Sequence, residues 1–115
     1  MPAEIDLKTF NYLKATAGDD FVGELIDTFF GEAVGTFAAL HASLGANNAE
    51  VFRRAAHSLK SSANTFGALR LGKMASELEQ FGRSNTLAAV GDALALTEAE
   101  YGDVQTALRR LRGGA

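Results

Sequence analysis

The feature that most constrains the fold is a mostly apolar repeat near the C-terminal end of the chain. Between positions 87 and 111 these residues recur at alternating steps of three and four. Such spacing is typical of one face of an α-helix, and it covers about 3.5 heptads here. The repeat consists of Leu87, Val90, Leu94, Thr97, Tyr101, Val104, Leu108 and Leu111. A helix with this face needs an apolar surface to cover it, supplied either by a coiled-coil partner or by its own chain.

Other segments of the same chain carry helical stripes that can provide this cover. The spacing predicts helices over residues 6–15, 19–44, 47–65, 68–83 and 87–111, the first of them short. No segment alternates with period two as a strand does, and the only proline is at position 2. Stripes on one chain can cover each other. The sequence therefore predicts an all-α fold, an antiparallel four-helix bundle with a short additional N-terminal helix.

Three local predictions concern residues outside these stripes. Asn47 and Glu50 have the spacing of a capping box, with Asn in place of Ser or Thr, which would start the third helix at Asn47. Gly31 and Gly35 lie one turn apart inside the second helix, where they would permit another helix to approach closely. Glu79 is expected to lie in solvent on the fourth helix.

Composition limits the class of protein. A chain of 115 residues suits a single domain, here residues 1–115, and it contains no cysteine. No apolar run reaches the ~20 residues of a membrane span, and residues 1–4 lack the pattern of a signal peptide. The net charge of -3 argues against nucleic-acid binding. We expect a cytoplasmic protein with neither a membrane nor a nucleic-acid partner.

Two common kinds of catalytic site are missing from the sequence. There is no glycine-rich phosphate loop, so ATP-dependent kinase activity is not expected. The two histidines, His41 and His57, are too far apart in sequence for a zinc motif, and no metal site is predicted. The sequence indicates no function for His41.

His57 lies on the outward side of its predicted helix. At ~100° per residue it falls about 140° from Phe52 of the apolar stripe. One interpretation is an incidental histidine on a solvated face. The other is a nucleophile that carries a phosphoryl group, because Lys60 at i+3 can offset phosphoryl charge and the small Ser61 at i+4 leaves room for it.

The segment from Ala56 to Ala68 resembles the signature of histidine-containing phosphotransfer (HPt) domains, which are relay modules of two-component phosphorelays. That signature has a histidine, an apolar residue at +2, lysine at +3, a small residue at +4 and glycine near +10. Leu59, Lys60, Ser61 and Gly67 match these positions after His57. Ser61 stands where the family often has glycine, a mild departure that keeps the residue small.

The resemblance implies a role for each of these residues. His57 would accept a phosphoryl group from an aspartyl phosphate on a receiver domain and pass it to another receiver. Lys60 would orient the group, Ser61 would keep the approach open, Asn64 would donate a hydrogen bond, and Gly67 would fix the turn beside the site. No cofactor is expected on this chain. Any Mg²⁺ would belong to the receiver, since no carboxylate of this chain is expected near His57.

Partner contacts are less defined by the sequence. Arg53 and Arg54 could steer an acidic receiver, or they could simply form a solvated face. Phe30 and Val34 lie at the edge of the second helical stripe, where they either complete the core or present an apolar patch to a partner.

The expected partners are response-regulator receivers and a hybrid histidine kinase. The alternative function is a helical adaptor or inhibitor that binds a receiver or a kinase without transfer. We expect a monomer, because the 87–111 stripe can be covered within the bundle, although such a stripe also suits a dimer.

Overall fold

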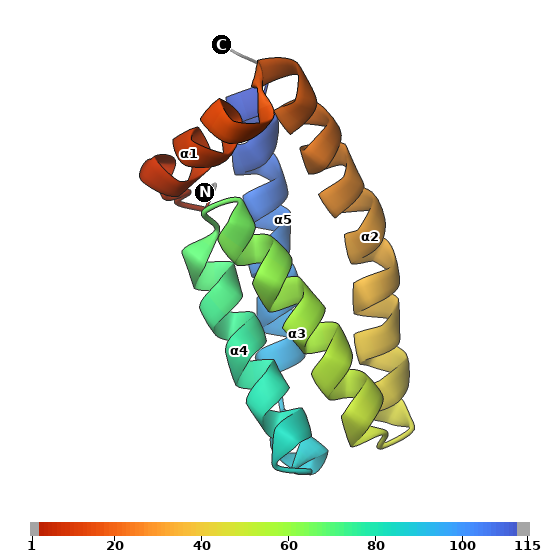
Figure 1. The fold of residues 1–115 in the computed structure, drawn as a ribbon. Helices are drawn as coiled ribbons and strands as arrows, with labels where there is room; N and C mark the ends of the chain where they lie inside the picture. The colour runs from red at the N-terminus through yellow and green to blue at the C-terminus, as the bar shows by residue number, and fades with distance from the viewer. Residues whose placement is uncertain (1–2, 113–115) are drawn as a thin grey trace.

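The computed structural model describes residues 3–112, and these residues form helices and connecting turns with no strand among them. In chain order the elements are α1 (Leu7–Ala17), α2 (Asp19–Gly45), α3 (Ala49–Thr65), α4 (Leu69–Arg83), the 3₁₀ turn η1 (Leu87–Ala89) and α5 (Ala93–Arg112). Figure 1 shows α2 to α5 running along one another as a bundle, with α1 lying across one end. The predicted all-α bundle with a short N-terminal helix is confirmed.

The apolar stripes meet in one continuous core. Phe52, Ile26, Leu71 and Val104, from four different helices, are completely buried. Each side chain of this kind stabilises the fold by about 1.5–3 kcal/mol. None of the helices among residues 3–112 is long and apolar enough to cross a lipid bilayer.

Aromatic rings fill the core where α2, α3 and α5 meet. The Phe29 ring stacks on Phe66 with centroids 5.1 Å apart, and it meets Tyr101 edge-on at 5.7 Å. Phe37 also packs against Tyr101, with the ring centroids 5.3 Å apart. Such pairs add to the stabilisation from burial alone.

The start of α3 differs from its prediction by one residue. Asn47 adopts a left-handed conformation (φ 54°) and closes α2, with its amide donating to Leu44 and the next amide donating to Ser43. Because Asn47 is used there, Asn48 caps α3 and accepts a hydrogen bond from the Val51 amide. The prediction of a capping box at Asn47 is therefore wrong.

The C-terminal stripe is not one continuous helix. Leu87 lies in the turn η1, the backbone bends at Gly91 (φ 54°), and α5 begins only at Ala93. Leu87 and Val90 remain buried because the bend keeps them against the core. Apolar spacing alone could not reveal this break. At the other end of the chain, α1 extends two residues beyond its expected end, to Ala17, and stops at Gly18 (φ 96°).

Close helix packing occurs at glycines other than the predicted pair. A Cβ added to Gly31 or Gly35 would meet no atom within 4 Å, so the prediction that they permit close approach is wrong within the described chain. On α4, a Cβ at Gly82 would lie 2.9 Å from the Ala49 carbonyl oxygen, and one at Gly72 would overlap the Asn64 side chain. In the described chain, α3 and α4 are in more extensive contact than any other pair of helices.

Gly67 joins the end of α3 to the N-terminal segment. Its φ is 82°, its amide donates to Asn64, and its carbonyl accepts from the Asp6 amide at 2.8 Å. Asp6 in turn caps α1 by accepting a hydrogen bond from the Thr9 amide. A Cβ on Gly67 would lie 2.6 Å from the Asp6 carbonyl oxygen.

Replacing Gly67 with alanine should therefore destabilise the protein by about 1–3 kcal/mol, through left-handed strain and the clash with Asp6. The matched control is Gly31→Ala, in open space within a helix, which should stabilise it by about 0.5–1 kcal/mol. Chemical denaturation of both variants provides the test. Equal unfolding midpoints for Gly67→Ala and the parent would contradict the strain.

The two tyrosines allow a second test, of the core. Burial raises the pKa of Tyr101 to about 12, and nearby Arg109 offsets this only partly. The pKa in the folded protein lies above the ordinary value of 10.0. The contribution of neutral, buried Tyr101 to the free energy of unfolding is therefore complete below pH 10 and is lost as the pH rises through 12. In a Tyr12→Phe variant, absorbance at 295 nm reports Tyr101 alone and should show its transition near pH 12. A transition near pH 10 in folded protein would show that the ring is not buried.

Candidate functional site

His57 projects from the middle of α3 into solvent. Its side chain is 57% exposed, whereas Phe52, Ala56 and Leu59 on the opposite side of the helix are buried. The predicted outward orientation is confirmed. An exposed ring gives a reaction partner access to one of its nitrogens.

Glu79 on α4 is the residue that sequence reasoning missed. Its side chain is only 4% exposed and accepts a hydrogen bond from Nδ1 of His57 at 3.0 Å. Lys60 Nζ lies 2.7 Å from the other carboxylate oxygen, and Arg83 Nη2 lies 2.9 Å from the oxygen that His57 uses. The predictions of a solvated Glu79 and of no carboxylate near His57 are both wrong.

A signal for this burial was present in the sequence. Glu79 follows Ala75 by four residues and precedes Gly82 by three, and both of those residues face the bundle. Their spacing places Glu79 on the edge of the α4 stripe. A buried carboxylate needs hydrogen-bond donors or cations as partners. Only the packing of α4 on α3 shows that three such donors surround Glu79.

The hydrogen bonds of Glu79 determine the tautomer of His57. The bond from Lys60 lowers the pKa of Glu79 most, burial opposes it, and the bond from His57 lowers it further. Glu79 is therefore ionised at neutral pH and can only accept hydrogen bonds. In neutral His57, Nδ1 must then carry the proton, which leaves the Nε2 lone pair directed away from Glu79.

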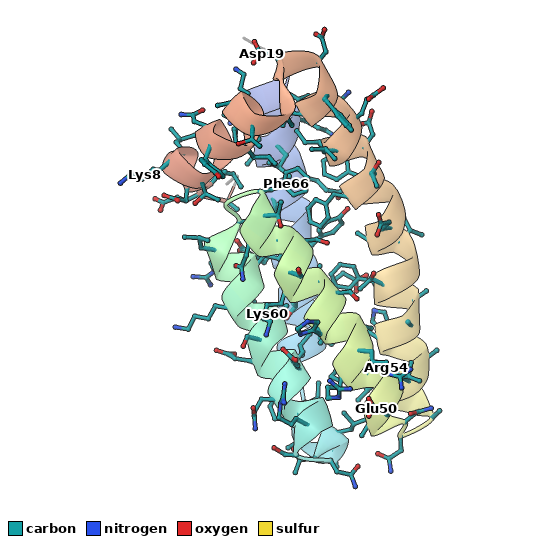
Figure 2. The ribbon with its side chains drawn as sticks, in the orientation of Figure 1. Lys8, Asp19, Glu50, Arg54, Lys60 and Phe66 are labelled. Carbon is teal, nitrogen blue, oxygen red and sulfur yellow. The ribbon has the colours of Figure 1, made fainter. Side chains whose placement is uncertain are left out.

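The other predicted supporting residues lie along the same side of α3. Lys60 is one turn beyond His57, with its side chain 29% exposed, and points toward α4 (Figure 2). Ser61 is exposed and small beside it. Asn64 lies two turns from His57 and packs over Gly72 instead of reaching the His57 ring. Gly67 is at the end of the helix, as predicted.

The predicted arginines lie on the N-terminal half of α3. Arg53 and Arg54 both pair with Glu50, and Arg53 is close enough to Glu79 to be affected by its charge. Beside them a groove of about 470 Å³ runs between α2 and α3. It is lined by Glu32, Gly35, Thr36, Ala39, Val51, Arg54, Ala55 and Ser58. The groove therefore adjoins the residue that follows His57.

Phe30 and Val34 are directed toward a different part of the surface. Phe30 is partly buried against the core, with the Arg109 guanidinium 5.4 Å from its ring centroid. Val34 is 74% exposed and borders a groove between α2 and α5. These two residues are thus separated from the α3–α4 face that carries His57.

Comparison with known proteins agrees with this geometry. The Hpt domain family matches residues 24–114. The chain belongs to the Hpt family. Its fold is similar to the crystal structure of histidine-containing phosphotransfer protein B (HptB) from Pseudomonas aeruginosa PAO1, with a TM-score of 0.81 and 27% sequence identity over 96% of each chain. No curated protein matches the chain.

Membership of the Hpt family identifies the class of function. The domain acts in histidine phosphotransfer within a phosphorelay, and its partners include response-regulator receivers and kinases. The alternative of an adaptor without transfer is not favoured by these likenesses.

The contacts of Glu79 with His57, Lys60 and Arg83 make the free energy of unfolding depend on pH in the acid range. Because the pKa of Glu79 in the folded chain is below its ordinary value of 4.5, its contribution is complete above pH 4.5 and is lost as the pH falls through the lowered value. Glu79→Ala should cost about 1–3 kcal/mol at neutral pH, because it removes the charged acceptor that His57, Lys60 and Arg83 share.

Unfolding of the parent and Glu79→Gln across pH 3–7 provides the measurement. Glutamine keeps the shape and one acceptor but cannot titrate, so the loss of stability below pH 4.5 should be smaller in this variant. Parallel curves for the two proteins would show that Glu79 does not hold a lowered pKa.

Proposed function

We propose that Nε2 of His57 is the atom that carries the phosphoryl group. The observation that supports this most directly is the bond between Nδ1 and the ionised Glu79, 3.0 Å long, because it leaves an unprotonated Nε2 on an exposed ring. A nucleophile needs such a lone pair, free of a proton and accessible to the reacting atom.

The transfer step balances without a further reactant. The Nε2 lone pair attacks phosphorus of an aspartyl phosphate on a receiver, an N–P bond forms, and the bond between phosphorus and the aspartyl oxygen breaks. The electron pair of that bond leaves with the aspartate as a carboxylate. Nδ1 of His57 keeps its proton, and Glu79 stabilises the positive charge that develops on the ring. Transfer to a second receiver is the reverse reaction.

Lys60 and Arg83 would balance the charge of the transferred group. Both cations are bound to Glu79, at 2.7 Å and 2.9 Å, and so border the His57 ring. Three phosphoryl oxygens arriving at Nε2 would find these donors nearby, which favours the transition state electrostatically. Ser61 would leave space for the group, and Asn64 would support α3 through its contact with Gly72.

The receiver would dock over α3 and the adjoining α2–α3 groove. Arg53, Arg54 and Arg83 give this side positive charge that complements an acidic aspartyl-phosphate pocket. The receiver would supply Mg²⁺, and a hybrid histidine kinase is one expected source of the phosphoryl group. A cytoplasmic location suits these partners.

Phosphoryl transfer can be tested with a matched pair of variants, because the chain has two histidines. A receiver charged with radiolabelled acetyl phosphate should label the parent and His41→Gln, with a bond that is stable in alkali and lost in acid. His57→Gln should take up no label, since amide nitrogen is not nucleophilic.

Circular dichroism and receiver binding control for folding. His57→Gln should remain folded and bind the receiver, because the ring is exposed. Label on folded His57→Gln would rule out His57 as the acceptor. Binding without label on the parent would support the adaptor function instead.

A further inference from the structure

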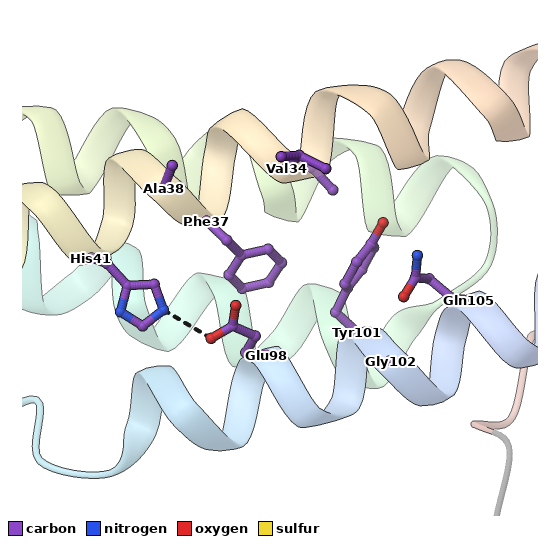
Figure 3. Close-up of a pocket in the computed structure, with 9 residues that line it drawn as sticks. Val34, Phe37, Ala38, His41, Glu98, Tyr101, Gly102 and Gln105 are labelled. Carbon is purple, nitrogen blue, oxygen red and sulfur yellow. Dashed lines mark hydrogen bonds and ion pairs between the residues drawn. The ribbon is translucent and has the colours of Figure 1, made fainter.

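A second surface feature lies on the opposite pair of helices from the phosphotransfer site. The groove between α2 and α5 has a volume of about 510 Å³ and an apolar floor formed by Ala33, Phe37 and Tyr101 (Figure 3). Val34 stands at its edge with 74% of its surface exposed. A protruding apolar side chain thus lies directly beside a hollow.

The Tyr101 hydroxyl lacks a hydrogen bond in this region. It is buried, and no partner for it occurs among residues 3–112. Buried polar groups in folded proteins are nearly always satisfied. Because this oxygen is closed to solvent, an acceptor from outside could reach it only if the side chains around it shift.

Glu98 lines one end of the groove, and Arg109, of opposite charge, lies one turn beyond Gln105 at the other end. Glu98, Gly102, Gln105 and Arg109 follow one another along α5 at steps of four, three and four, and so lie on one side of the helix. At one end Glu98 is 2.8 Å from His41, and at the other end Arg109 covers the ring of Phe30. The two α5 charges are about 16 Å apart along the helix. Gly102 and Gln105 lie between them.

We propose that this face binds a second copy of the chain. A two-fold axis would cross α5 between Asp103 and Val104 and α2 near Thr36, so that the two α5 helices run antiparallel. Glu98 of each copy would then face Arg109 of the other, and this pair would form twice. Val34 of each copy would enter the hollow beside Ala38 of the other. This dimer differs from the monomer that is expected from the sequence.

Self-complementarity favours a second copy over an unrelated partner. Isologous interfaces require a surface that fits itself after a two-fold rotation. Here the protruding Val34 and the groove occur on one face. Glu98 and Arg109, which have opposite charges, lie at equal distances from the proposed axis. A Cβ added to Gly102 would meet no atom within 4 Å, so the centre of the face is open to close approach. In this dimer Gln105 of one copy lies over Gly102 of the other, near the unsatisfied Tyr101 hydroxyl.

The dimer would leave phosphotransfer possible in both copies. His57 and Glu79 lie on α3 and α4, whereas the proposed interface uses α2 and α5. The proposal does not depend on His57 being the phospho-acceptor, and its test requires no phosphoryl group.

Sedimentation velocity over a concentration series is the first measurement. The parent should rise from 12.1 kDa toward twice that mass as concentration increases. Gly102→Glu should raise the dissociation constant by roughly tenfold or more, because it places a carboxylate at the centre of the interface. Its own fold should be unharmed, since the position is open. Ser76→Glu, which adds the same charge to the exposed surface of α4, should behave like the parent.

Charge reversal tests the antiparallel arrangement. Glu98→Arg and Arg109→Glu should each weaken the dimer, since each places like charges opposite one another. The double variant should recover most of the lost affinity. A parent that stays at 12.1 kDa at every concentration would overturn the proposal, and so would a dimer that resists Gly102→Glu. Failure of the double variant to recover would overturn the antiparallel arrangement.

Discussion

The structure around His57 depends on one buried carboxylate. Glu79 could not remain ionised between α3 and α4 without donors, and His57, Lys60 and Arg83 provide them. The same bonds give the carboxylate a lowered pKa and determine which nitrogen of His57 holds the proton. A single acidic residue thus couples the packing of two helices to the chemistry of the exposed ring.

That coupling requires α3 and α4 to pack against each other, and they are in more extensive contact than any other pair of helices among residues 3–112. Gly72 and Gly82 remove side-chain bulk from α4 on either side of Glu79, and α3 fills the space with Asn64 and Arg53. A larger residue at Gly82 would meet the backbone of α3 at Ala49 and Arg53 and so separate the helices, whereas one at Gly72 would displace the end of the Asn64 side chain. Gly82 therefore contributes to the contacts of Glu79 through the spacing of α3 and α4, although it does not touch His57.

The bundle also separates its surfaces by role. The charged donors Lys60 and Arg83 lie on α3 and α4 near His57, while α2 and α5 enclose an apolar groove with Val34 at its edge. Because four helices surround one core, each adjacent pair presents its own seam to solvent. A partner on the α2–α5 seam need not compete with one that approaches His57.

The sequence by itself determined the helical bundle and the outward position of His57, because these follow from apolar spacing. It also determined the likeness to HPt domains, and with it the turn expected at Gly67, because that likeness rests on residues close together in the chain. Only the tertiary structure decided that Glu79 is buried and that Phe30 and Val34 lie away from His57. It also decided that α5 begins at Ala93 and that Gly72 and Gly82 make the close contacts. Those outcomes depend on how helices distant in sequence are rotated and spaced against each other, and periodicity within one helix carries no information about its neighbour.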